Sequence, residues 1–285
     1  IPASCCGLVG LKASRGRIKD KEVPSHLPAN IFHDGVVTRS VRDTWAFHAE
    51  IEKNIPATEY PAIGNISESF PEKLKIAVLT ENCLGENSSA ELVQVTHDVA
   101  KLCDSLGHKI EMISNPFYRK FDEDFWLLWA HFSFLLRYSG KEFSPKFDHT
   151  QLEQWPKYLI ARHWKNIHKI PFAFWRLKRF VSQYENFMQN FDILLTPTLG
   201  TTVPELGFFG PEVSGQDHWD RINDFLPFTK YQNISGAPAI TLPFGTDTKG
   251  LPIGIQLSSR LGEDRLLLKL SLQLEQNSNW KSLGK

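Results

Sequence analysis

The stretch from residue 74 to residue 113 constrains the fold of this chain more than any other part of it. LKIAVL (74–79) is a mostly apolar run, typical of a strand covered on both faces. Ser88 or Ser89 can then cap a helix that Gly107 ends, and residues 108–113 form a second strand-like run. The helix is indicated by an apolar stripe at helical spacing, made of Leu92, Val95, Val99, Leu102 and Leu106. Strand, helix and strand in this order predict a βαβ unit with two parallel strands.

The rest of the chain continues the same alternation. A length of 285 residues allows one large domain or two smaller ones. Ser40 is a good helix cap. Residues 54–71 are rich in Pro, Gly and Ser, which indicates a linker or surface loop. Residues 201–215 are rich in Gly and Pro and indicate a loop long enough to have a function. We expect strands over 35–38, 192–198, 238–245 and 252–257, and helices over 41–53, 121–139, 151–168, 172–190 and 263–277. The sequence therefore predicts an α/β fold with a mixed, mostly parallel sheet flanked by helices, and an inserted helical region at about 115–190.

Charge and cysteine usage exclude several classes of function. The formal net charge is zero, so nucleic acid is not an expected partner. No run of 18 apolar residues occurs, and the basic, aromatic segment 172–180 is interpreted as a helix with a solvated face, so membrane contact is not expected. The four cysteines are Cys5, Cys6, Cys83 and Cys103, and they form no CxxC pair. This pattern indicates reduced thiols in a cytoplasmic protein, and no metal site is expected.

No catalytic set is evident from residue types alone. Ser4, Ser14 and Ser40 are candidate nucleophiles, but neither a GxSxG elbow nor an SxxK motif surrounds them. Cys6 is interpreted as a small buried hydrophobe rather than a reactive thiol, because no cationic residue or His lies near it in the sequence. Lys12 is interpreted as a lysine that reaches solvent at a strand end rather than as a base.

Residues 1–18, IPASCCGLVGLKASRGRI, resemble the end of the signature region of the amidase signature family. The family pattern Cys-Gly-x-x-Gly-Leu-Lys-Pro-Ser/Thr is matched except at Ala13, where Pro is usual. The segments GVVTRSVRD, DILLTPT, YQNISGAPAITLPFG and GLPIGIQL resemble later family segments in the same order. The double cysteine and the run SRGR resemble the branch of 6-aminohexanoate cyclic dimer hydrolases. The matched residues of the first segment are Pro2, Cys6, Gly7, Gly10, Leu11, Lys12 and Ser14.

The resemblance implies hydrolysis of carboxylic, non-peptide amides through a serine acyl-enzyme with a Ser–Ser–Lys triad. The acyl-forming serine would be the third residue before Ile1, with the other two members further upstream, and Lys12 matches a different family position. Residues 1–285 would then be the C-terminal portion of a single amidase signature domain, without a catalytic residue and inactive alone. The implied chemistry needs no metal or organic cofactor. Its partner is a small amide substrate, and a homodimer is possible at full length.

Two alternatives accompany this interpretation. The chain could be a catalytically inactive remnant or a partner-dependent subunit of the same fold. It could also be a relative of the amidotransferase subunit that acts on misacylated tRNA, which the neutral charge and the aromatic-rich middle disfavour.

Five residues are candidates for contact with substrate. Trp126 and Trp129 share a helical stripe that could line an apolar acyl pocket, although packing in the helix core is the preferred interpretation. Thr198 ends a buried strand, where α/β sheets tend to bind ligands. Gln232 and Asn233 could position a substrate amide or equally satisfy loop backbone. Cys6 is expected near the active site without taking part.

Overall fold

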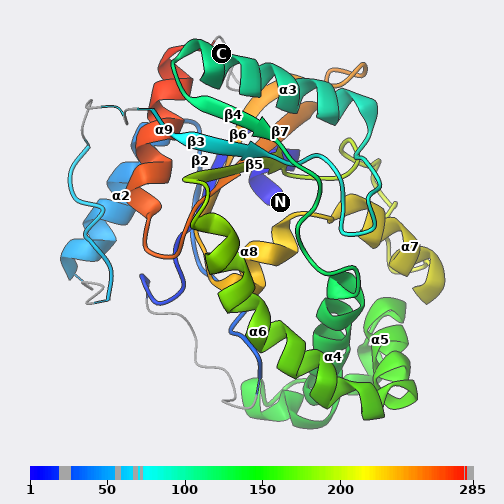
Figure 1. The fold of residues 1–285 in the computed structure, drawn as a ribbon. Helices are drawn as coiled ribbons and strands as arrows, with labels where there is room; N and C mark the ends of the chain where they lie inside the picture. Colours follow the sequence, from blue (N-terminus) through cyan, green and yellow to red (C-terminus); the bar gives the residue numbers. More distant parts are fainter. Residues whose placement is uncertain (19–26, 55–58, 67–69, 71–72, 279, 281–285) are drawn as a thin grey trace.

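Seven strands in the described part of the computed structural model form one mixed sheet, in the order β2-β1-β6-β7-β5-β3-β4 (Figure 1). The structure describes residues 1–18, 27–54, 59–66, 70, 73–278 and 280. The strands are β1 (Val9–Lys12), β2 (Val37–Thr38), β3 (Lys75–Val78), β4 (Lys109–Met112), β5 (Ile193–Pro197), β6 (Ala239–Thr246) and β7 (Pro252–Ser258).

The predicted βαβ unit is confirmed. β3 and β4 are parallel, with Ile76 beside Ile110, and α3 (Ala90–Ser105) connects them. β5 adds a second parallel neighbour to β3, with Ile193 beside Ile76. The α/β fold with a mixed sheet flanked by helices is thus as expected. Among the described strands, parallel pairing occurs only between these three and is less extensive than expected. β6 and β7 form a hairpin whose short turn requires antiparallel strands, and β1 and β5 pair with this hairpin in antiparallel orientation.

The five helices expected from periodicity are present with shifted ends. They are α2 (Val41–Asn54), α4 (Phe121–Phe143), α5 (Gln154–Lys165), α6 (Ile170–Met188) and α9 (Asp264–Gln276). Ser40 Oγ accepts from Asp43 N at 3.1 Å at the start of α2, as predicted. α5 is shorter than expected because 3₁₀ turns at His149–Gln151 and Ile167–Lys169 flank it.

Three short helices were not expected from the sequence. α1 (Pro2–Cys5) and α8 (Thr229–Ser235) are too short to show helical periodicity. α7 (Gly215–Phe225) begins where the predicted loop ends, and Ser214 Oγ accepts from Asp217 N at 3.1 Å as its cap. The segment 54–71 was expected to be a linker. Its residues 55–58, 67–69 and 71 lie outside the described residues, and Ile63 within its described part is fully buried.

Helices cover both faces of the sheet, and the alternation of strand side chains explains why. Ile76 and Val78 of β3 join a core shared with α2, α3 and α9. Ala77 and Leu79, which point the other way, join a core shared with α4, α6 and α8. Figure 1 shows α4, α5 and α6 as a lobe below the sheet, with Ile1 near the centre of the molecule. A strand buried on both faces needs the continuous apolar sequence that β3 and β5 have.

A buried polar cluster fastens the segment after β1 to α9. Ser14 Oγ donates to Asp264 Oδ2 at 2.6 Å and accepts from Gly262 N at 2.8 Å. Arg17 Nε lies 2.8 Å from the same Asp264 oxygen, and Arg17 Nη1 lies 2.6 Å from Glu52 Oε1. Ser14, a candidate nucleophile by residue type, therefore has a structural role.

Candidate active site

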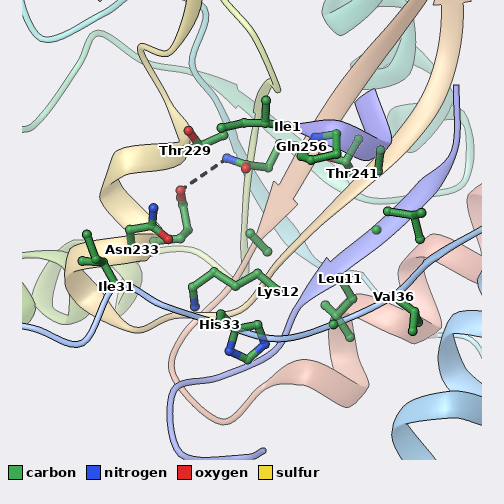
Figure 2. A pocket seen from close by; sticks show the side chains of 17 residues that line it. Ile1, Leu11, Lys12, Ile31, His33, Val36, Thr229, Asn233, Thr241 and Gln256 are labelled. Atoms are coloured by element: carbon green, nitrogen blue, oxygen red, sulfur yellow. Dashed lines mark hydrogen bonds between the residues drawn. The ribbon is translucent and has the colours of Figure 1, made fainter. Parts of the chain in front are cut away.

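A cavity of about 320 Å³ opens beside Ile1, where α1, β1, α8 and the hairpin β6–β7 meet (Figure 2). Its wall brings together residues from both ends of the chain. The polar side chains in this wall are Lys12, His33, Thr229, Gln232, Asn233, Thr241 and Gln256, and the apolar ones include Ile1, Leu11, Ile31 and Val36.

A buried chain of amides and hydroxyls supports one side of this cavity. Gln256 Nε2 donates to Gln232 Oε1 at 3.3 Å, the bond drawn in Figure 2. Gln232 Nε2 donates to Ser258 Oγ at 3.0 Å, and Tyr184 OH donates to the same hydroxyl at 3.2 Å. Both ends of the Gln232 amide are therefore engaged by the protein, which fixes α8 against β7.

Gln232 and Asn233, the two predicted amide contacts, differ in how they are held. Both lie on α8 and in the cavity wall, although the sequence placed them in a loop before a strand. Gln232 is 1% exposed. Asn233 is partly exposed, and within the described part of the chain its side-chain amide makes no hydrogen bond. Asn233 is thus the better placed of the two to bind a ligand, and both roles stay predictions.

Thr198 lies behind the cavity rather than in its wall. Its hydroxyl is fully buried and lies 3.0 Å from Thr241 Oγ1, and Thr241 lines the cavity. A direct contact of Thr198 with substrate stays a prediction, and the geometry gives it a role in orienting Thr241.

Lys12 does not extend into solvent as its position at a strand end suggested. Its Nζ donates to the carbonyls of Ala237 at 3.0 Å and Gly236 at 3.4 Å, which ties β1 to the turn after α8. His33 Nε2 accepts from Ala13 N at 3.0 Å. Burial, aided by the charge of Lys12, lowers the pKa of His33 from 6.5 to about 4. The cavity therefore holds a neutral imidazole at neutral pH.

Trp126 and Trp129 do not line the cavity beside Ile1. Trp126 is 4% exposed, its Nε1 donates to Asn223 Oδ1 at 2.6 Å, and its ring packs edge-on against Trp155 at 5.8 Å. It borders a different cavity of about 430 Å³ between α4 and α7. Trp129 packs against Phe125 and Phe132. Their contact with substrate stays a prediction, while the packing interpretation fits these contacts.

The remaining nucleophile candidates have different surroundings. Cys6 is exposed, contrary to the expectation of a buried hydrophobe, because it follows the last residue of α1 instead of continuing into a core strand. Pro2 and Ala3, close to Cys6 in the chain, line the cavity. Ser4 is a buried residue of α1, and Ser40 caps α2.

Comparison with known proteins decides the family. The family model for amidases matches residues 1–268. The chain belongs to the amidase signature family. The AmiC protein of Mycobacterium tuberculosis is 37% identical over 282 residues, which cover 98% of this chain and 59% of that protein. The 6-aminohexanoate-cyclic-dimer hydrolase of Pseudomonas sp. is 29% identical over 306 residues, covering 98% of this chain and 61% of that enzyme.

Solved structures agree with this assignment. The structure of a 6-aminohexanoate cyclic dimer hydrolase superposes with a TM-score of 0.80 at 26% identity, over 98% of this chain and 62% of that one. A bacterial aryl acylamidase shares the fold at 20% identity, with a TM-score of 0.74 over 98% of this chain and 60% of the other. The amidase signature chain described here thus spans about three fifths of the length of these relatives.

Sequence reasoning missed several residues of the site and its support. Gln256 belongs to GLPIGIQL, a segment that indicates the family, and nothing in the local sequence marks its side chain as part of the site. Thr241 had no signal in the sequence because its partner Thr198 is distant in the chain, and Thr229 had none because it begins the unpredicted helix α8. Lys230, 1% exposed and 2.8 Å from Asp122 Oδ2, was missed because α8 was not predicted.

No group of three or more His, Cys, Asp and Glu side chains in the described residues is placed to hold a metal ion. Among the helices of the described residues, none is both long enough and apolar enough to cross a membrane.

Proposed function

We propose that the protein is an amidohydrolase that cleaves small, non-peptide carboxylic amides through a serine acyl-enzyme. The observation that carries the proposal is the position of Ile1 and Pro2 in the wall of the cavity. In the family pattern, the acyl-forming serine is the third residue before Ile1. Three residues of extended chain span at most about 11 Å, so that serine would lie at or close to this cavity.

The chemistry of the proposed reaction follows from a Ser–Ser–Lys triad upstream of Ile1. A neutral lysine would accept a proton through one serine and so activate the other as the nucleophile. Backbone N–H groups of the nucleophile segment would stabilise the oxyanion. The amine then leaves, and water hydrolyses the acyl-enzyme. No step of this sequence calls for a metal or an organic cofactor.

The residues described here would supply the walls of the substrate site. Asn233 would position the substrate amide, and Gln232 and Gln256 would hold α8 in place for it. Ile1, Leu11 and Ile31 would contact the apolar part of the acyl or amine group. The substrate class proposed is a linear or cyclic amide of a small molecule. A cytoplasmic location and a homodimer of the full-length protein are part of the same proposal.

The test compares two forms of the protein in hydrolysis of a simple anilide. The first form is the protein as its gene encodes it, and the second is residues 1–285 alone. We expect turnover from the first form, none from the second, and loss of turnover when the serine at the third position before Ile1 is replaced by Ala.

Two other outcomes would contradict the proposal. Turnover by residues 1–285 alone would show that the catalytic residues are not upstream. Absence of turnover by the gene-encoded protein on a panel of anilides and aliphatic amides would support an inactive remnant or a partner-dependent subunit instead.

A further inference from the structure

The hairpin formed by α5 and α6 exposes large apolar side chains at its tip. Trp164 is 51% exposed, Ile167 48%, Phe172 65% and Trp175 56%. They lie at the end of α5, in the 3₁₀ turn and in the first two turns of α6. We call these four residues the hairpin patch. The opposite side of α6 is fully buried, so the patch is a second apolar surface in addition to the packing face.

The sequence around the hairpin patch has one sign of charge. Residues 154–184 contain no Asp or Glu. Lys169 and Arg176 pair with carboxylates of α4, at 3.4 Å from Glu123 Oε1 and 2.6 Å from Asp124 Oδ2. The Lys and Arg residues of this segment are Lys157, Arg162, Lys165, Lys169, Arg176, Lys178 and Arg179.

Several of these cations have no carboxylate partner. Within the described residues, Lys157, Lys165, Lys178 and Arg179 form no ion pair. The guanidinium of Arg179 lies over the Trp175 ring, 4.7 Å from its centroid. At least one of these cations thus lies beside an exposed ring, and all four lack a carboxylate that would compete with an external anionic surface.

Segment 172–180 has both a buried face and a face exposed to solvent, as expected. The predicted buried stripe exists, as Ala173, Leu177 and Phe180 are fully buried. The other face combines exposed aromatic rings with unpaired cations, which is the side-chain chemistry of helices that lie in a bilayer interface. Tryptophan favours this interface because its ring is apolar while its N–H can remain hydrated.

We propose that the hairpin patch docks on the surface of an anionic lipid bilayer, with its aromatic rings in the headgroup region and its lysines and arginines facing the lipid charges. A second copy presenting the same patch would bring like charges together. An RNA would satisfy the cations but would leave Ile167 and Phe172 uncovered. The hairpin lies at the end of the helical lobe away from α3 and the sheet, so it can meet a flat surface (Figure 1).

The test is sedimentation of the gene-encoded protein with vesicles of phosphatidylcholine, with and without phosphatidylserine. We expect binding only to vesicles that contain phosphatidylserine, weakening with added salt. The double variant Trp164→Ser/Trp175→Ser removes both rings, and Lys178→Glu/Arg179→Glu reverses two charges. Each double variant should lower vesicle affinity by about tenfold or more.

The matched controls are Leu206→Ser and Lys249→Glu, which change an exposed leucine and an exposed lysine in other parts of the chain. Both should bind like the wild type. Quenching of tryptophan fluorescence by brominated lipids should be strong in the wild type and reduced in the Trp164→Ser/Trp175→Ser variant.

Three results would overturn the proposal. The first is no binding to phosphatidylserine vesicles at low salt. The second is binding that the two patch variants leave unchanged. The third is light scattering that shows self-association of the protein, lost in both patch variants, without vesicle binding, which would identify a second copy as the occupant.

Discussion

Lys230 Nζ lies 2.8 Å from Asp122 Oδ2, and this ion pair joins α8 to the first turn of α4. Lys230 is 1% exposed, and its ammonium also lies over the Trp126 ring at 5.7 Å from the centroid. Burial of a charged group away from water costs free energy, and only a partner of opposite charge can offset that cost. The pair therefore fixes the helix that presents Gln232 and Asn233 to the cavity.

Removal of one partner of this pair should destabilise the protein strongly. We expect Asp122→Asn to lower the free energy of unfolding by about 3 kcal/mol, because it leaves the buried ammonium without a counter-charge. The double variant Lys230→Met/Asp122→Leu should recover part of the loss. Urea denaturation measures both values. A loss of less than about 1 kcal/mol in Asp122→Asn would contradict the role of the carboxylate as counter-charge.

The cluster around Asp264 should behave in a similar way. Asp264 is fully buried and binds both Ser14 and Arg17. Asp264→Asn should cost about 3 kcal/mol in unfolding free energy, because Arg17 would lose one of its two carboxylates. Asp98→Asn is the control, since the Asp98–Lys101 pair is exposed and worth less than about 1 kcal/mol. A loss no larger than that of the control would contradict the structural role of the cluster.

Buried His48 should make the protein sensitive to mild acid. Burial lowers the pKa of His48 from 6.5 to about 4. The nearby charge of Asp264 opposes this decrease in pKa, whereas the charges of His33 and Arg17 add to it. Protonation therefore favours the unfolded chain. Neutral His48 therefore makes its full contribution to the free energy of unfolding above pH 6.5, and this contribution is lost as the pH falls from 6.5 towards 4. Its full size is about 3 kcal/mol.

The variant His48→Gln tests this pH dependence. Urea midpoints measured at pH 7 and at pH 4.5 should fall less in His48→Gln than in the wild type. Replacement of exposed His149 by Gln should leave the difference unchanged. If His48→Gln keeps the whole acid sensitivity, other groups must cause it.

Gln232 and Asn233 should respond differently to replacement by Ala. Gln232→Ala breaks the buried bonds to Gln256 and Ser258 and should cost about 1–3 kcal/mol in unfolding free energy. Asn233→Ala should change stability by less than about 0.5 kcal/mol. In the gene-encoded enzyme, it should raise KM for an anilide by about fivefold to tenfold. An unchanged KM would remove Asn233 from the proposed substrate site.

Much of the fold could be predicted because its signals are local. The apolar run at 74–79 and the stripe on α3 placed one strand and one helix with little ambiguity. Ser40 was identified as a cap because its hydroxyl needs only the N–H of Asp43. α8 could not be predicted from periodicity, since seven residues give less than two turns of pattern. The proportion of parallel pairing was overestimated because strand order depends on contacts distant in the chain.

In the candidate site, too, some features follow from local sequence and others depend on tertiary contacts. The sequence by itself determined the family, through short segments in a fixed order, and it drew attention to Gln232 and Asn233. Only the tertiary structure decided that Gln232 is bound to Gln256 while the Asn233 amide stays open to the cavity, and that Trp126 lies elsewhere. The physical reason is that a residue's exposure and hydrogen-bond partners depend on which distant segments of the chain pack against it. The residues next to it in the sequence do not determine which segments those are. Lys12 illustrates this, since two of its three backbone acceptors, Gly236 and Ala237, lie more than 220 residues away.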